Sequence, residues 1–98
     1  MNMQQIMKQA QSMQKDMLKI EEEINAKEFE GENSIVTVKV NGKKEVLSIN
    51  IDKTNNLDKE DIEMLEDVLT VALNNAFKKV DQYKEQKMSK FGNIPGLF

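Results

Sequence analysis

Apolar residues near the start of the chain recur at intervals of three and four, which predicts a long amphipathic helix over residues 2–26. The spacing is a heptad pattern held for three heptads. Asn2, followed three residues later by Gln5, resembles a weak capping box and supports a helix start at this point. The apolar stripe consists of Met3, Ile6, Ala10, Met13, Met17, Ile20 and Ile24, widened by Met7 and Leu18.

Two interpretations of this stripe remain open. In the first, the helix covers a sheet of the same chain; in the second, part of the stripe contacts a second chain. Both can hold, because a helix of this length extends beyond a small sheet. Four of the nine stripe residues are Met, whose flexible side chain packs adaptably against different partners. The candidate residues of a dimer interface are Met3, Ile6, Met13 and Met17, together with Val36 and Val38 from the following segment.

The pattern changes to strict alternation after residue 27, and alternation is typical of strands. Val36, Val38 and Val40 alternate with polar residues, and Asn41-Gly42 then gives a strong hairpin signal. A two-residue turn at that point predicts that Val36 lies opposite Leu47. It also predicts that the tip of the hairpin projects into solvent.

A third strand is expected before this hairpin. Residues 27–30 alternate around Phe29, and their charged positions suit the edge of a sheet. Gly31 is expected at the turn that follows. Residues 27–52 therefore predict a three-stranded antiparallel sheet.

Apolar residues return to helical spacing over residues 59–88. Asp58 is a plausible N-cap, and Glu60, Asp61 and Glu63 place negative charge at the positive end of the helix dipole. The predicted buried stripe contains Ile62, Leu65, Leu69, Ala72, Ala76, Val80 and Tyr83. The fold class predicted from these elements is α+β, in the order α-β-β-β-α, as a dimer.

The pattern predicts one domain over residues 1–91 and a short tail over 92–98. Gly92 and Pro95 prevent the second helix from continuing. The tail is interpreted as a frayed, disordered terminus, with docking of its apolar residues in a groove as the alternative. The first 24 residues lack the long apolar run of a membrane span or signal peptide, so we expect a cytoplasmic location and no membrane partner.

The composition excludes most enzyme chemistry. The 98 residues contain no Cys and no His, and therefore no thiolate nucleophile, no imidazole base and no ligand of either type for a metal. Asn41-Gly42-Lys43-Lys44 lacks the remaining residues of a phosphate-binding loop. Residues 52–58 lack the Gly and the acidic third position of a calcium loop. We expect no enzyme activity, no metal and no cofactor.

Charge is unevenly distributed along the chain. The formal net charge of −3 argues against a simple basic nucleic-acid binder. However, residues 1–19 carry a net charge of +2 and residues 78–98 of +3, whereas residues 53–77 carry −4. All fourteen basic residues are Lys. The candidate phosphate-contacting residues are Lys8, Lys15, Lys19, Lys43, Lys44, Lys78, Lys79, Lys84, Lys87 and Lys90.

The whole chain resembles the YbaB/EbfC family of bacterial nucleoid-associated DNA-binding proteins. The resemblance rests on the Met- and Gln-rich opening helix, Met7–Met17, on the strand and hairpin Val36–Gly42, and on Asp61–Leu69 with its continuation to Met88. The ending Pro95-Gly96-Leu97-Phe98 is also similar to the family. No single motif is specific, but together they match in order over nearly the full length.

The resemblance implies a non-enzymatic homodimer in the nucleoid that binds duplex DNA with weak or variable sequence preference. Because the chain has Lys but no Arg, contacts with the DNA backbone are favoured over readout of bases. The alternative is a protein-interaction adaptor whose helices or tail bind a recombination or repair protein. The family resemblance suggests such a partner because family genes commonly lie beside those for a clamp loader and a recombination mediator.

Overall fold

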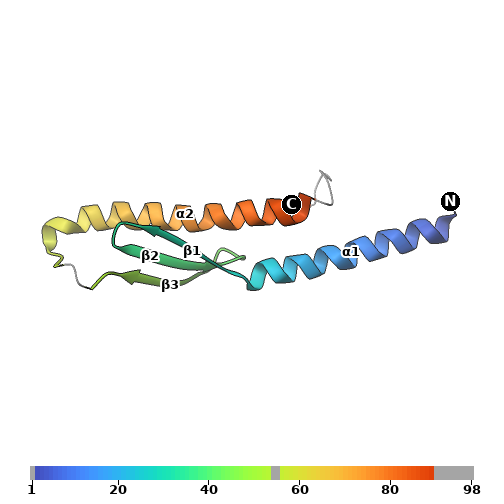
Figure 1. Cartoon of the computed structure of the whole chain (residues 1–98), viewed down its shortest axis with the longest axis horizontal. Coiled ribbons are helices and arrows are strands. Elements are labelled where there is room, and N and C mark those ends of the chain that lie inside the picture. The colour runs from blue at the N-terminus through green and yellow to red at the C-terminus, as the bar shows by residue number, and fades with distance from the viewer. Residues whose placement is uncertain (1, 54–55, 90–98) are drawn as a thin grey trace.

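The computed structural model describes residues 2–53 and 56–89 of the chain. Two helices flank a three-stranded sheet, in the predicted order α-β-β-β-α (Figure 1). The elements are α1 (Met3–Ala26), β1 (Glu28–Asn33), β2 (Val36–Asn41), β3 (Val46–Ile51), the short 3₁₀ helix η1 (Lys59–Asp61) and α2 (Ile62–Met88). The α+β class is therefore confirmed.

The predicted caps Asn2 and Asp58 are both present, but residues 59–61 form the 3₁₀ helix η1 and α2 begins at Ile62, three residues later than predicted. The side chain of Asn2 accepts a hydrogen bond from the Gln5 amide at 2.9 Å. Asp58 and Asp61 form a reciprocal capping box, in which Asp58 accepts from the Glu60 amide and Asp61 from the Asp58 amide. These contacts satisfy amide groups that the first turn of a helix leaves without a partner.

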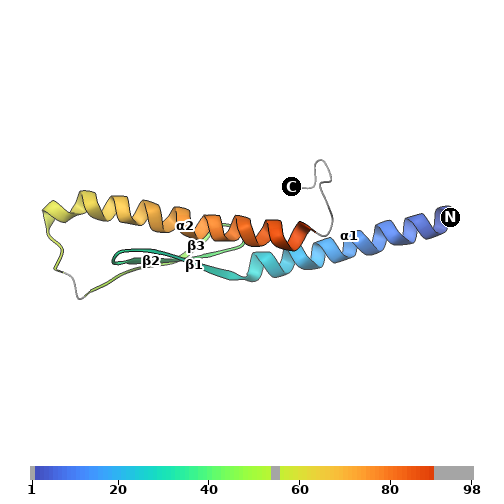
Figure 2. The same cartoon turned by 45° about the horizontal axis from the view of Figure 1, so that its top comes forward.

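The molecule is elongated, with extents of 70 × 20 × 15 Å. α2 lies along the sheet, whereas α1 continues away from it and carries the N-terminal end far beyond the strands (Figures 1 and 2). Every residue from Asn2 to Asp16 is exposed, and Ile24 is the buried residue of α1. The interpretation in which α1 covers the sheet is therefore wrong for this chain.

The core lies between α2 and the inner face of the sheet. Val36, Val38 and Val40 on β2 are fully buried against the small residues of α2 and Val80. Phe29 on β1 completes this layer. Since α2 packs against β1 and β2, these two strands supply the buried side chains of the sheet, and the residues of β3 are exposed or half-buried.

Val36 and Val38 belong to this core. We named both from the sequence as candidate dimer-interface residues, but their side chains are fully buried within the single chain. A partner subunit has no access to them, because α2 already occupies that face of β2. The structure thus corrects their assignment from an intermolecular surface to the interior.

The sheet is antiparallel with the strand order β1-β2-β3. Val36 lies opposite Ile51, and Val38 lies opposite Ile49, so the predicted pairing of Val36 with Leu47 is wrong. The two-residue turn assumed for Asn41-Gly42 is replaced by a longer loop in which the Asn41 amide donates to the Glu45 carbonyl. A β-bulge then shifts the register by one residue: Lys39 pairs with Ser48, but Val40 pairs with Val46.

The hairpin tip contacts both helices, although Lys43, Lys44 and Glu45 remain exposed. At Gly42 a Cβ atom would lie 1.8 Å from the Ile24 carbonyl oxygen, so the tip fits under the end of α1 only without a side chain there. On the other side of the tip, Lys44 forms an ion pair with Asp81 of α2 at 2.8 Å. The tip is therefore exposed to solvent as predicted, but it is held beside the two helices instead of projecting free of them.

Gly31 also has a different place from the one expected. It lies inside β1 and faces α2, whereas the turn after β1 is made by residues 34–35, with Ser34 at a φ of 53°. β1 is consequently longer than the alternation around Phe29 suggested. The predicted tail over 92–98 lies outside the described residues.

Candidate nucleic-acid interface

The candidate lysines occupy three elements that meet at one end of the sheet. α1 carries Lys8, Lys15 and Lys19; the hairpin tip carries Lys43 and Lys44; the C-terminal half of α2 carries Lys78, Lys79, Lys84 and Lys87. Gly42 brings the tip to the end of α1, and the ion pair of Lys44 brings it to α2. Lys90 lies outside the described residues. Lys8 and Lys15 lie further out, on the part of α1 that extends beyond the sheet.

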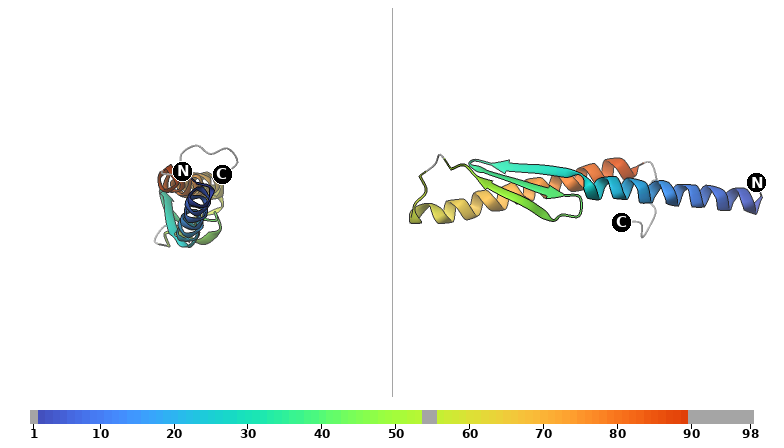
Figure 3. Two further views of the ribbon diagram at one scale, coloured as in Figure 1. Left: turned by 90° about the vertical axis from the view of Figure 1, so that its right-hand side faces the viewer. Right: turned by 90° about the horizontal axis from the view of Figure 1, so that it is seen from below.

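The acidic segment lies at the opposite end of the molecule. α2 begins far from α1 and runs back along the sheet toward it (Figures 1 and 3). The early residues of this helix include Glu63, Glu66 and Asp67, and η1 adds Glu60 and Asp61. The charge of residues 53–77 therefore lies far from the candidate lysines of α1 and of the end of α2, whereas Glu21, Glu22 and Glu23 lie on α1 itself.

Two of the candidate lysines make polar contacts within the chain. The ammonium group of Lys79 donates a hydrogen bond of 2.7 Å to the Glu30 carbonyl oxygen, which ties α2 to β1. Lys44 is paired with the Asp81 carboxylate. A phosphate would have to compete with these partners, so Lys79 and Lys44 are weaker candidates than the lysines of α1 and the end of α2.

An aromatic contact near the end of α2 holds two further ammonium groups. The Nζ atoms of Lys27 and Lys87 lie 5.0 Å and 5.5 Å from the centre of the Tyr83 ring. The ring packs edge-on against Phe29, with the ring centres 5.5 Å apart. Cation–π attraction restrains both lysines at this position. The sequence did not single out Lys27, because nothing local links it to a tyrosine 56 positions later.

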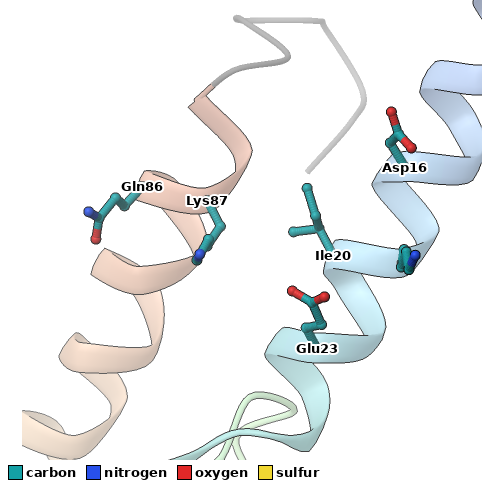
Figure 4. Close-up of a pocket in the computed structure, with 6 residues that line it drawn as sticks. Asp16, Ile20, Glu23, Gln86 and Lys87 are labelled. Atoms are coloured by element: carbon teal, nitrogen blue, oxygen red, sulfur yellow. The ribbon is translucent and has the colours of Figure 1, made fainter.

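A shallow cleft of about 590 Å³ separates the facing surfaces of α1 and α2. Ile20 and Glu23 project from α1 toward α2 in Figure 4. The lining residues are Asp16, Lys19, Ile20, Glu23, Gln86 and Lys87. Two carboxylates and two ammonium groups line the cleft, so its formal charges are equal in number and opposite in sign.

The described residues contain no group of three or more acidic side chains placed to hold a metal ion. Neither α1 nor α2, as far as the chain is described, is apolar enough over a sufficient length to cross a membrane.

Comparison with known proteins identifies the family. Residues 1–94 match the model of the YbaB/EbfC DNA-binding family. The chain belongs to this family. It is 45% identical to a nucleoid-associated protein of Clostridium novyi, with all of this chain and 90% of that protein covered. It is 44% identical to a nucleoid-associated protein of Chloroflexus aurantiacus, with complete coverage of both.

A solved structure supports the fold of this YbaB/EbfC family member independently. The crystal structure of an uncharacterized protein of Helicobacter pylori superposes with a TM-score of 0.76, at 23% identity, and covers 95% of this chain and 99% of that one. At that identity the likeness shows the fold alone. The family is one of nucleoid-associated DNA-binding proteins of bacteria, and it is not an enzyme family.

Proposed function

We propose that this protein is a homodimeric nucleoid-associated protein that binds duplex DNA largely through lysine–phosphate contacts, with little sequence specificity. One observation carries the proposal: the exposed lysines of α1 and the end of α2 lie at one end of the long axis, and the acidic start of α2 lies at the other. DNA approaching the lysine-bearing end is attracted, although the chain as a whole is negative.

The chemistry of lysine accounts for the low specificity. An ammonium group is a compact charge that contacts a phosphate oxygen and releases a condensed counterion, without reporting which base is present. Bidentate recognition of guanine by a guanidinium is unavailable, because the chain has no Arg. Binding of this kind is strong at low salt and weakens steeply as salt is added.

The proposal is tested by measuring affinity for duplex DNA at several salt concentrations. Replacing Lys84 and Lys87 with Gln should lower the slope of log K against log salt by about 0.9 for each phosphate that the variant no longer neutralises. The matched control replaces Lys53 and Lys59 with Gln at the acidic end, which should leave the slope unchanged. The proposal would be refuted if no binding were detected at micromolar protein concentration, or if the affinity did not change with salt.

The homodimer is tested separately, by sedimentation of the full chain. A chain of 98 residues buries a limited fraction of its surface, and the described part exposes many large apolar side chains. We expect the mass of a dimer at micromolar concentration. A monomer mass under those conditions would refute the homodimer while leaving lysine–phosphate binding open to its own test.

A second function is favoured by the exposed apolar stripe of α1. Met3, Ile6 and Met7 are exposed on the part of the helix that extends beyond the sheet, and a helix of this pattern can lie in the groove of another protein. An adaptor would retain a protein partner after nuclease digestion. It would lose that partner, and keep its affinity for DNA, when Ile6 and Met7 are replaced with Gln.

A further inference from the structure

The apolar stripe of α1 continues past the end of α2 without cover. Ile24 is buried, and Ile20 projects toward α2 in the cleft between the helices (Figure 4). Met13 precedes Ile20 by about two helical turns and therefore lies on the same side of α1. α2 ends at Met88, part-way along α1 (Figures 1 and 2), and Met13 is 45% exposed. The cleft therefore opens onto an apolar strip, from Ile20 to Met13, that none of the described elements covers.

Residues 90–98 begin beside this strip. The described chain ends at Ser89, two residues after Lys87 in the wall of the cleft. An extended segment of nine residues spans at most about 30 Å. At about 1.5 Å per residue, Met13 lies only about 10 Å along α1 from Ile20. The segment 90–98 is therefore long enough to cover the whole strip.

The composition of this segment suits an apolar surface. Lys90 is its one charged side chain, and the charges that line the cleft are equal in number and opposite in sign, so no charge opposes entry. A segment that stays solvated is typically poor in aromatic residues and rich in charge. Residues 90–98 have the opposite character. Four of the nine are large and apolar: Phe91, Ile94, Leu97 and Phe98.

We propose that residues 90–98 pack along α1 of their own chain, beside the end of α2, with Phe91 against Ile20 and Ile94 against Met13. This order of contacts follows the direction in which α2 runs along α1 (Figure 1). The segment then ties the protruding half of α1 to the end of α2, so the lysines of both helices belong to one body. The first turns of α1 lie beyond the contact and stay exposed. The inference depends neither on DNA binding nor on the homodimer.

Engineered disulfides test the contact, because the chain has no Cys of its own. A variant with Met13→Cys and Ile94→Cys should form an intramolecular disulfide under mild oxidation, since docking brings the two side chains together. The matched control combines Gln11→Cys with Ile94→Cys. Gln11 is exposed at nearly the same level of α1 but on almost the opposite face. The first pair should oxidise roughly tenfold faster or more, because docking raises its effective concentration.

The outcomes distinguish the possible occupants of the strip. An intramolecular link that forms faster at position 13, at a rate independent of protein concentration, supports the proposal. Equal rates for the two pairs would overturn it, because an undocked segment reaches both positions alike. A disulfide that joins two chains, with a doubled mass and a rate that rises with concentration, would overturn it in favour of a second copy. Far-ultraviolet circular dichroism checks that each variant is folded.

Amide hydrogen exchange tests the same contact without a cross-link. Replacing Phe91 and Ile94 with Ser should speed exchange over residues 16–22 several-fold, because the segment no longer stabilises that part of α1. The matched control replaces Lys90 and Asn93 with Ser, which keeps the apolar side chains and should leave the exchange unchanged. Exchange that is the same in the wild type and in the Phe91 and Ile94 variant would overturn the proposal.

Discussion

Gly31 lets α2 approach the sheet closely because it has no side chain. A Cβ atom there would lie 2.3 Å from the Ala72 carbonyl oxygen and 2.5 Å from the Ala76 amide nitrogen. These are backbone atoms of a helix and cannot move aside as a flexible side chain would. Ala72 and Ala76 are fully buried against the same strand, so small residues on both elements make the close contact possible.

Replacing Gly31 with Ala should destabilise the fold by about 1 to 3 kcal/mol, the range typical of overpacking. For a domain of this size, each 1 kcal/mol lowers Tm by about 4 to 8 °C. Glu32→Ala, at the exposed neighbouring position, serves as the control and should melt close to the wild type. Equal melting of the two variants would show that α2 adjusts its distance from β1 at no cost.

The loop between β2 and β3 is organised by Asn41. Its side-chain oxygen accepts hydrogen bonds from the amides of Lys43 and Glu45, at 2.9 and 3.0 Å. Its side-chain nitrogen donates to the Glu45 carboxylate at 2.8 Å. The loop in turn sets Gly42 under the end of α1 and Lys44 beside Asp81. One side chain therefore links the hairpin to both helices.

Asn41→Ala should remove these side-chain bonds and cost about 1 to 2 kcal/mol in total, since exposed hydrogen bonds contribute about 1 kcal/mol each at most. Faster exchange of the Lys43 and Glu45 amides with solvent is the direct measurement. Asn41→Asp keeps both acceptor bonds but faces the Glu45 carboxylate, so it should fall between Asn41→Ala and the wild type. If the Lys43 and Glu45 amides exchange at the same rate in the wild type, Asn41→Ala and Asn41→Asp, Asn41 does not organise the loop.

The molecule as a whole combines a packed body with a helix that extends beyond it. Its radius of gyration is 19.5 Å, against about 13 Å for a compact chain of similar length. The body holds the buried residues of α2 and β2, whereas the first turns of α1 are exposed on all sides. An isolated helical segment of this length is marginal in water without packing on one face.

Amide hydrogen exchange should therefore form a gradient along the chain. The Ala76 and Val80 amides should exchange most slowly, and the amides of residues 6–14 should exchange within the fastest group, since local opening there breaks no tertiary contact. Mass spectrometry of proteolytic fragments measures both regions in one experiment. Slow exchange over residues 6–14 would contradict the prediction and would indicate that a partner covers the exposed stripe of α1.

Local sequence information was sufficient for the elements and for the identity of the candidate lysines. Helix starts depend on residues within three positions of one another, so Asn2 and Asp58 could be recognised as caps directly. The alternation of β2 and the helical spacing of α2 placed both elements, because burial of one face imposes a period. The ten lysines could be named as candidates from their charge and position in the chain. The sequence could not predict that Lys44 forms an ion pair with Asp81 or that Lys79 donates a hydrogen bond to the Glu30 carbonyl.

The sequence by itself therefore determined the order of elements, the helix caps, the separation of basic from acidic segments and the packed stripe of α2 except Ile62, which was predicted as buried but is 54% exposed. Tertiary structure alone decided that α1 leaves the sheet, that Val36 pairs with Ile51, and that the hairpin tip docks on both helices. The physical reason is the distance along the chain over which each interaction acts. Periodicity and capping act between neighbours, whereas register and docking depend on steric fit between atoms far apart in the chain, such as Gly42 against the Ile24 carbonyl.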